Sequence, residues 1–471
     1  MRLQKFMSLL LSCIMLCLSF QANCLSIYAE ALSAAEPTTD SDGTQAWNKS
    51  LGTDAYPQFS GKAVSYISEH GEEVYSNTNI SCNNHSYVNG ICKTCGEYEV
   101  PTLENGAYQL SNYGELVWFQ QYVDADNTGA NAVLTADITA NKNLLKEDGS
   151  VSDVPVYKWT PIGRDLKLYY TGTFDGNGHI ISGLYSYSDD YYDYCGLFAK
   201  MKGTIKNLGI VDSYFGGKNC YHAASFAGYA VEGSVIENCF SDSSVVGYAY
   251  CGGIAGETYG KISNCYYIGK ITADSTDSNA ISSDKYNYGA LENCYYLESC
   301  GLSTTRAVGK TAEQFASGDV CYILKSSENN LVWGQNLSSE GSMPVLTSDE
   351  ELRVYRVTTV KDDASSSYYS NSSCTLPADD TGYWIDENGK VLYSPAKITK
   401  DTTITFKQFV SVLGDVNQNG KVEKADAAAV LRHVSGISLI SDEAELLLAD
   451  VNRDGNVDVR DAVEIIKKAA A

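Results

Sequence analysis

The chain has 471 residues and a formal net charge of −24, a length sufficient for about two to four domains. The acidic balance argues against nucleic acid and anionic membranes as partners, because phosphate binding requires clustered Lys and Arg. The chain is rich in Tyr and Gly, with 35 and 40 residues, and it contains 15 Cys, which is many for its length.

The amino-terminal segment has the pattern of a secretory signal peptide. Arg2 and Lys5 precede an apolar run from Met7 to Phe20, and small residues follow as far as Ala34. The apolar run is too short to span a bilayer, and no other segment could cross one. We therefore expect a secreted, extracellular protein that is associated with a scaffold or a cell surface.

A Cys/His motif follows a polar stretch that is rich in Ser, Thr and acidic residues. Four borderline or soft ligands fall within fourteen residues, namely Cys82, His85, Cys92 and Cys95. This spacing suits a tetrahedral structural zinc, whose four protein ligands would close the site to catalysis. Use of the cysteines in disulfides, or no special role, remain alternatives.

A repeat dominates the middle of the chain. An Ile or Leu two residues before an Asn recurs at intervals of about 28 residues, which is typical of a solenoid. The recurring asparagines are Asn207, Asn238, Asn264 and Asn293. Stacked coils would place these in an internal amide ladder, and would place Cys239, Cys265 and Cys294 in a column of buried free thiols.

These units, with the lead-in Gly172 to Leu184, resemble GLUG repeats. The resemblance implies a right-handed parallel β-helix and specifies no activity. Leu116, Phe119 and Val123 lie at helical spacing and predict a helix that caps the first coil. A second helix near Thr311 to Ala316 is expected to close the other end.

The pattern then changes to an alternation of Tyr, Val and Thr from Arg353 to Ser411. This alternation predicts a small all-β module that acts as a spacer, with a polar Ser-rich loop at 365–373.

The last sixty residues contain one loop pattern twice, with every ligand position repeated at an offset of 35. A twelve-residue calcium loop supplies oxygen ligands at positions 1, 3, 5, 7, 9 and 12, with Gly at position 6. Gly420 and Gly455 occupy position 6. The predicted ligands are Asp415, Asn417, Asn419, the Lys421 carbonyl, Glu423 and Asp426 in the first loop, and Asp450, Asn452, Asp454, the Asn456 carbonyl, Asp458 and Asp461 in the second. The first loop has Asn419 where the second has Asp454, so we expect it to bind calcium more weakly.

A duplicated loop–helix with Asp at position 12 resembles a type I dockerin over Leu413 to Ala471. The resemblance implies two bound calcium ions, calcium-dependent folding and docking onto a cohesin module of a scaffolding protein, as in a cellulosome. The cohesin contacts that it implies are Lys424, Ala425, Arg432, Val459, Arg460 and Lys467. Lys424-Ala425 in the first copy stands against Val459-Arg460 in the second, so the two cohesin-binding faces are not expected to be equivalent.

The expected fold is therefore mainly β, a right-handed parallel β-helix with a small all-β module and a C-terminal α-helical dockerin. The predicted segments are a signal peptide (1–34), a linker (35–81), a zinc-knuckle-like motif (82–96), a GLUG-type β-helix (97–350), the all-β module (351–411) and the dockerin (412–471).

No catalytic motif accompanies the solenoid, which favours a non-catalytic accessory subunit that displays a glycan- or protein-binding surface, with plant polysaccharide as a candidate ligand. Tyrosines such as Tyr185, Tyr187 and Tyr194 could stack on sugar rings. The alternatives are a surface adhesin and a polysaccharide lyase or glycoside hydrolase. For an enzyme, the candidate groups are Arg164, Asp165, Asp175, His179, Asp189, Asp190 and Asp193.

Overall fold

The computed structural model describes residues 65–69, 72–76, 85–152, 157–164, 169–191, 193–283, 289–324 and 332–470. The predicted signal peptide, Cys82 and Asp165 lie outside these ranges. The chain divides into two units, Met1–Glu99 and Val100–Ala471.

The first unit contains two short antiparallel hairpins. Within the predicted linker, β1 (Ser65–Glu69) pairs with β2 (Glu72–Ser76). Next, β3 (Tyr87–Val88) pairs with β4 (Ile91–Cys92). Asn89 and Gly90 form the turn between β3 and β4, both with positive φ, as a two-residue Asn-Gly hairpin turn requires. This turn brings the Cys/His segment back on itself.

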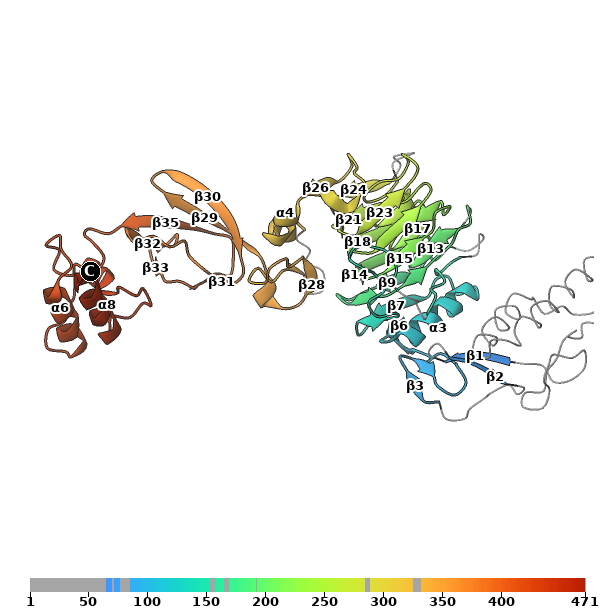
Figure 1. The fold of residues 1–471 in the computed structure, drawn as a ribbon, viewed down its shortest axis with the longest axis horizontal. Coiled ribbons are helices and arrows are strands. Elements are labelled where there is room, and N and C mark those ends of the chain that lie inside the picture. Colours follow the sequence, from blue (N-terminus) through green and yellow to red (C-terminus); the bar gives the residue numbers. More distant parts are fainter. Residues whose placement is uncertain are drawn as a thin grey trace, which may run out of the picture. The chain divides into compact units, whose positions relative to one another are not determined.

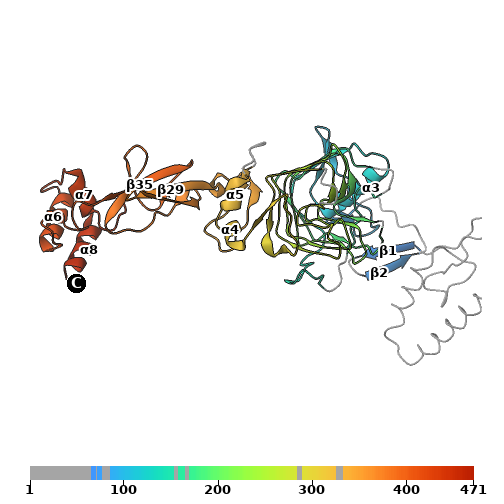
Figure 2. The same cartoon turned by 90° about the horizontal axis from the view of Figure 1, so that it is seen from above.

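The second unit begins with a parallel β-solenoid, so the predicted β-helix is confirmed (Figure 1). Successive coils contribute neighbouring strands to a 13-stranded sheet, and the coils superimpose in the view of Figure 2. The strands along this sheet are β5 (Thr102–Glu104), β6 (Ala107–Leu110), β7 (Asn131–Leu134), β9 (Thr173–Asp175), β14 (Thr204–Val211), β18 (Val235–Ser241), β22 (Tyr266–Tyr267), β25 (Tyr295–Leu297) and β26 (Val308–Lys310), joined by β8 (Ile138–Thr139), β10 (Ile180–Ser182), β21 (Lys261–Ser263) and β24 (Ala290–Glu292).

Three smaller parallel sheets form the other walls of the coils. Their strands are β11 (Tyr185–Ser186), β15 (Tyr214–Gly216), β19 (Ser244–Gly247) and β23 (Lys270–Ala273) in one, β12 (Tyr194–Cys195) and β16 (His222–Ala223) in the second, and β13 (Phe198–Met201), β17 (Ala227–Ala230) and β20 (Ala255–Thr258) in the third. Each coil therefore buries its inner side chains against its two neighbours.

The hydrophobic interior is built from columns of side chains in register. Phe174, Ile205, Ile236 and Ile262 are paired across adjacent strands and are all buried. Partly exposed and buried residues alternate over the first four residues of β14 and of β18, which is the period-2 pattern of a strand, and the residues that follow are buried as far as Ile210 and Ser241. Branched and aromatic residues fill such columns well, and they fix the register of the coils.

The asparagine ladder is confirmed, in two segments. Asn238 donates through Nδ2 to Oδ1 of Asn207 at 3.1 Å, and Asn293 donates to Asn264 at 2.7 Å. All four asparagines have φ between 52° and 53°, a left-handed conformation that Asn tolerates better than most residues. Asn207 also donates to Asp175, which extends the first segment.

The predicted column of free thiols is also present, since Cys239, Cys265 and Cys294 are free and buried. A second group of buried free cysteines, Cys195, Cys220 and Cys251, was not predicted. A hydrogen bond with Cys195 and burial raise the pKa of Cys220 far above its ordinary value, so the thiol stays protonated. These cysteines act as small apolar residues of the core.

Helices occur at both ends of the solenoid, as predicted. Helix α3 (Tyr113–Asp124) begins at the N-cap Asn112 and buries Leu116, Phe119 and Val123 completely. At the other end α4 (Ala312–Ala316) buries Phe315 in an aromatic cluster with Tyr266 and Trp333. The remaining elements here are η1 (Glu298–Cys300), α5 (Asp319–Ile323), β27 (Val332–Gly334), β28 (Val345–Thr347) and η2 (Glu350–Leu352).

A small β-sheet module follows, with its own buried cluster that includes Val357, Trp384 and Ile404. Its five-stranded sheet has the order β30-β29-β35-β32-β33, with β31 and β34 paired beside it. The strands are β29 (Tyr355–Lys361), β30 (Ala364–Ser370), β31 (Ser373–Cys374), β32 (Gly382–Ile385), β33 (Val391–Leu392), β34 (Ala396–Lys397) and β35 (Thr402–Gln408).

The predicted Ser-rich loop at 365–373 is wrong. Most of that stretch is β30, which pairs antiparallel with β29 from Ser370 back to Ala364. Ser366 and Ser367 lie at the sheet edge, where their hydroxyls bond to Thr359 and Thr358 across the strands. An edge strand can be polar because one side of it faces solvent, so low hydrophobicity did not mean a loop here.

The chain ends in three helices, α6 (Lys424–Val434), α7 (Glu443–Ala449) and α8 (Val459–Ala470). Helices α6 and α8 pack through Val430 and Ile465, both completely buried. Among the described residues, none of the helices combines the length and the apolar character needed to cross a bilayer.

Candidate functional site

The two C-terminal loops have the same backbone conformation. Gly420 and Gly455, at position 6, have φ of 86° and 85°. Gln418 and Arg453, at position 4, also lie in the left-handed region at 57° and 59°. The duplication seen in the sequence is therefore a duplication of backbone shape, and Gly is required where the chain turns most sharply.

The first carboxylate of each loop is bound by backbone amides in the same way. Asp415 accepts from the N–H groups of Asn419 and Gly420, at 3.0 and 2.7 Å. Asp450 accepts from the matching groups of Asp454 and Gly455, at 3.2 and 3.0 Å. These bonds wrap each loop around its first carboxylate.

The last carboxylate of each loop accepts hydrogen bonds from the loop backbone and from the residue that precedes the following helix. Asp426 accepts from the backbone N–H of Asn417 and Glu423, at 3.1 and 2.9 Å. Asp461 makes the matching bonds to Asn452 and Asp458, at 3.1 and 2.8 Å. An acidic residue in the first turn of a helix is favoured by the helix dipole, so one side chain serves both the loop and the helix.

These four aspartates are buried, with exposures between 0% and 4%. Burial of an ionised carboxylate is costly unless a charge compensates it. Burial raises the pKa of Asp450 to about 6, and the charges of Asp461 and Asp454 add to that effect. A bound cation would reverse this effect, and the surrounding donors are all oxygens, as calcium requires. The residues present therefore fit a calcium ion in each loop.

The remaining predicted ligands are exposed or half-buried and differ between the loops. In the first loop, Asn419 Nδ2 donates to Glu423 at 3.0 Å. In the second loop, Arg460 contacts both Asp454 and Asp458, at 2.6 and 2.7 Å. The second loop thus has one more carboxylate than the first, but the guanidinium of Arg460 competes with calcium for it.

The six residues that the dockerin resemblance marks as cohesin contacts all lie exposed on α6 and α8. Lys424 and Val459 occupy matching positions at the starts of the two helices, and Arg432 and Lys467 occupy matching positions near their ends. Four further exposed apolar side chains were missed, Leu431 and Val434 on α6 and Val463 and Ile466 on α8. Their helical spacing from Val459 could have identified the two on α8.

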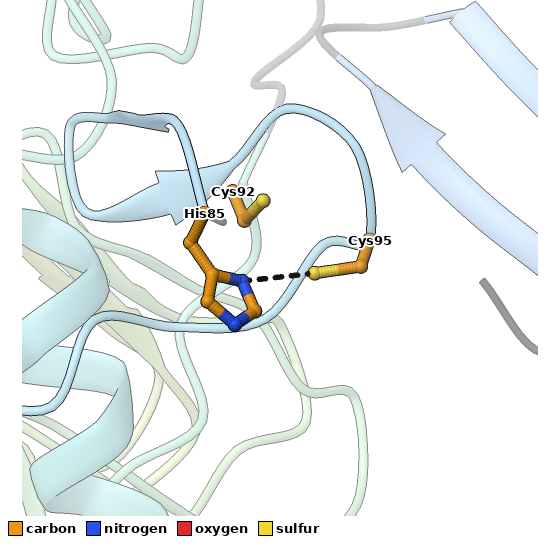
Figure 3. A group of neighbouring side chains, drawn as sticks. All are labelled: His85, Cys92 and Cys95. Carbon is orange, nitrogen blue, oxygen red and sulfur yellow. Dashed lines mark hydrogen bonds between the residues drawn. The ribbon is translucent and has the colours of Figure 1, made fainter. Parts of the chain in front are cut away.

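The Cys/His motif brings three of its four residues together (Figure 3). Donor atoms of His85, Cys92 and Cys95 all lie within 4.8 Å of one another, and Nδ1 of His85 is 3.3 Å from Sγ of Cys95. Cys82 lies outside the described residues. Burial raises the pKa of the Cys92 thiol, but backbone hydrogen bonds from Cys95, Thr94 and Ser86 outweigh it and lower that pKa to about 5. A thiolate is the form that binds metal.

The candidate catalytic groups on the solenoid are held by separate partners. Arg164 forms a two-pronged pair with Asp193, with the closer contact at 2.8 Å. His179 contacts Asp137 at 3.1 Å. Asp175 accepts from the backbone of Asn177 at 2.8 Å, so it belongs to a turn, and Asp189 accepts from Tyr187.

No curated protein matches the chain. A structural comparison matches it to a Bacteroides ovatus protein that is provisionally named as an immunoglobulin A1 protease, at 20% identity and a TM-score of 0.35. The match covers 52% of this chain and 93% of the other. The resemblance to GLUG repeats stays a prediction.

A family model for the dockerin type I domain matches residues 413–468, which contain both loops, α6, α7 and nearly all of α8. Dockerin domains bind calcium and have cohesin modules as partners. Residues 413–468 of this chain are a dockerin type I domain.

Proposed function

We propose that this protein is a secreted, non-catalytic accessory subunit of a cellulosome-like complex. Its C-terminal domain binds two calcium ions and docks onto a cohesin module of a scaffolding protein. Its β-solenoid displays a surface that binds a glycan or a protein. The observation that carries the proposal is the repeated set of backbone bonds to buried carboxylates, four in each loop.

Calcium would be held by the twelve ligand positions, and it would supply the positive charge that the buried aspartates lack. In its absence Asp426 and Asp461 still accept hydrogen bonds at the first turns of α6 and α8, but no positive charge compensates the two buried carboxylates of each loop. Calcium binding is thereby coupled to the position of the two helices. The exposed residues of α6 and α8 would then contact cohesin.

The test is retention of the full-length chain on immobilised cohesin modules of several types, in calcium and in excess chelator. We expect retention by at least one cohesin in calcium, loss of it in chelator, and loss of it in the double variant Asp415→Ala/Asp450→Ala. Asp148→Ala, an exposed aspartate on a solenoid loop, is the matched control. Retention that is unaffected by chelator would contradict the proposal.

We also propose that the Cys/His motif holds one structural zinc. The support is the convergence of His85, Cys92 and Cys95, together with the hydrogen bonds that lower the pKa of the Cys92 thiol. Elemental analysis of the purified full-length chain should give one zinc per chain, and Cys92→Ser should lower that content to near zero. Equal zinc content in the two proteins would count against this site.

The enzymatic alternative is a β-helix polysaccharide lyase or glycoside hydrolase, and the second alternative is an adhesin. Incubation of the protein with plant polysaccharides, followed by assays for reducing ends and unsaturated uronates, separates these classes. Product formation would overturn the non-catalytic proposal. The separate pairing of Arg164 and His179 favours the absence of products.

A further inference from the structure

One outer face of the solenoid carries a cluster of aromatic and charged side chains, which we name the tyrosine face. It comes from β12, β13, β16, β17, β20 and the segment before β20, in three consecutive coils. Of these strands, β13 and β17 are labelled in Figure 1. Its central members are Tyr194, Lys200, His222, Tyr229, Tyr250 and Glu257.

Strand pairing places these residues side by side. Lys200, Tyr229 and Glu257 are register partners across β13, β17 and β20. Tyr194 and His222 are register partners across β12 and β16. Because neighbouring strands lie about 4.8 Å apart, side chains in register form rows that cross the coils. The face is therefore as rigid as the solenoid beneath it.

The rings form a continuous aromatic surface. His222 stacks on Tyr194 at 4.6 Å and on Tyr250 at 5.1 Å between ring centroids, and Tyr229 lies 6.1 Å from Tyr194. The surface continues to Tyr191 and Tyr248, which are 50% and 39% exposed. These two exposed rings join the half-buried central rings through Tyr221, whose ring centroid lies 5.2 Å from that of Tyr248 and 5.9 Å from that of Tyr250.

Fixed polar groups lie among the rings. Lys200 is only 4% exposed, and its Nζ lies 4.7 Å from the centre of the Tyr194 ring. Glu257 is 9% exposed, accepts from the Tyr259 hydroxyl at 3.0 Å and faces Nε2 of His222 at 3.3 Å. The other ring nitrogen of His222, Nδ1, is buried with no hydrogen-bond partner among the described residues.

Stacking between coils alone does not explain this composition. Tyrosine rings would stabilise the coils equally well with apolar neighbours, whereas nearly buried Lys, Glu and imidazole groups carry a desolvation cost. Ligand sites characteristically combine aromatic surface with a small number of fixed polar groups. Tyrosine also offers both an apolar ring and a hydroxyl, which matches a sugar ring with its C–H face and its hydroxyl rim.

We infer that the tyrosine face binds a neutral pyranose polysaccharide, which lies across successive coils. This inference rests on the proposed function, since it specifies what the solenoid displays. A neutral chain is favoured because the charge of Lys200 is balanced by Glu257, and because a protein of net charge −24 repels polyanions. Glycoside hydrolysis commonly requires two carboxyl groups, whereas Glu257 is held by His222 and Tyr259, and Asp193 by Arg164.

The test is affinity gel electrophoresis of the full-length protein in calcium, in gels that contain xylan, mixed-linkage β-glucan, galactomannan or polygalacturonate. We expect retardation by at least one of the three neutral glycans and none by polygalacturonate. The double variant Tyr229→Ala/Tyr250→Ala should weaken binding at least about tenfold. Glu257→Gln, which keeps the shape of the side chain, should weaken it in the same direction.

The control variant is Tyr383→Ala, which removes a half-buried tyrosine from the small β-sheet module and should leave retardation unchanged. Thermal unfolding of every variant establishes that the solenoid is intact. The inference is overturned if no neutral glycan retards the protein, if the tyrosine and Glu257 variants bind as well as the parent, or if polygalacturonate binds best. Release of reducing ends that Glu257→Gln abolishes would overturn it in favour of catalysis.

Cohesin retention is measured on the same variants, and it separates the two proposals. Loss of glycan binding with retained docking would confirm that the tyrosine face acts independently of the dockerin. Failure of docking with glycan binding intact would overturn only the proposed attachment.

Discussion

At the scale of single residues, the asparagine ladder shows two requirements met by one side chain. Asn238 adopts φ of 52°, and its amide bridges to Asn207 in the neighbouring coil. Gly would tolerate the positive φ, and Gln would supply an amide, but few residues other than Asn do both. The recurring Asn of the repeat therefore indicates both a left-handed backbone turn and a hydrogen bond between coils.

Asn238→Ala should lower the stability of the solenoid. The left-handed backbone disfavours Ala by about 1–2 kcal/mol. Loss of the donor to the buried Asn207 oxygen adds about 1–3 kcal/mol. Denaturant unfolding followed by tyrosine fluorescence measures the sum.

Two further variants separate these terms. Asn238→Gly relieves the backbone strain and should retain only the cost of the lost amide. Asn293→Ala has the same φ but lies exposed at the end of the ladder, so its cost should be smaller. Equal effects at positions 238 and 293 would show that the buried amide contributes nothing.

The second calcium loop contains a residue that opposes binding. Arg460 contacts Asp454 and Asp458, both predicted ligands, and must release them when calcium enters. Arg460→Ala should therefore strengthen calcium binding at this loop by about two- to fivefold, the range expected for an exposed ion pair. Calorimetric titration of the full-length chain measures the affinity.

Arg432→Ala is the matched control. Arg432 is also exposed, but it bonds to the Ala428 carbonyl of its own helix, with no ligand carboxylate involved. If the calcium affinity of Arg460→Ala is unchanged, Arg460 does not compete with calcium. The number of carboxylates alone would then make the second loop the tighter calcium site.

At the scale of elements, a helix or strand could be predicted when its sequence pattern was complete within one segment of the chain. The helix that contains Leu116 and Phe119 was predicted because its apolar spacing is complete within one segment. Helix α7 was missed, although the Asp442 side chain accepts from the N–H groups of Ala444 and Glu445, because Glu443 to Ala449 provides only two turns of pattern. Strand β30 was misread because its partner β29, and not its own hydrophobicity, determines its conformation.

The candidate sites divide in the same way. The predicted calcium ligands follow from spacing within twelve residues, so the sequence alone places both loops inside the dockerin domain, and the individual ligands stay predictions. The tyrosine face joins residues from several strands and three coils, and the sequence offered only an excess of tyrosine. Register between Lys200, Tyr229 and Glu257 becomes visible only when the coils are stacked.

The two exposed helices of the dockerin present unequal faces. On α8, Val459, Val463 and Ile466 form an exposed apolar stripe. The matching positions of α6 carry Lys424, Ala428 and Leu431, and with Val434 at its end α6 has two exposed large apolar side chains where α8 has three. Apolar area that is buried on association contributes about 25 cal/mol per Å², so α8 is the expected main contact.

Val463→Asp should therefore weaken cohesin binding at least about tenfold. Ala428→Asp places the same charge at the matching position of α6 and should have a smaller effect. Surface plasmon resonance with immobilised cohesin compares the two. The reverse order would show that α6 carries the interface.

At the scale of the whole chain, the second unit contains separate hydrophobic clusters. One includes Phe240 and Trp333 at the end of the solenoid, another includes Trp384 in the β-sheet module, and a third includes Val430 and Ile465 in the dockerin. Both calcium loops border the third cluster, and the second loop also contacts the β-sheet module, because Arg453 donates to the Asp379 carbonyl at 2.7 Å. Cooperative unfolding requires shared packing, so these parts are expected to unfold in separate steps.

Removal of calcium should consequently destabilise the dockerin and leave the stability of the solenoid unchanged. Each loop that is saturated at one hundred times its Kd should add about 2.7 kcal/mol to the stability of the dockerin and nothing to that of the solenoid. Differential scanning calorimetry of the full-length chain should show one transition that moves to lower temperature with chelator and another that stays in place. The Asp415→Ala/Asp450→Ala variant should reproduce the chelator result in calcium, because the buried first ligand of each loop is gone. A shift of every transition together would mean that the loops stabilise the chain through contacts outside their own cluster, and it would overturn the assignment of calcium to the dockerin alone.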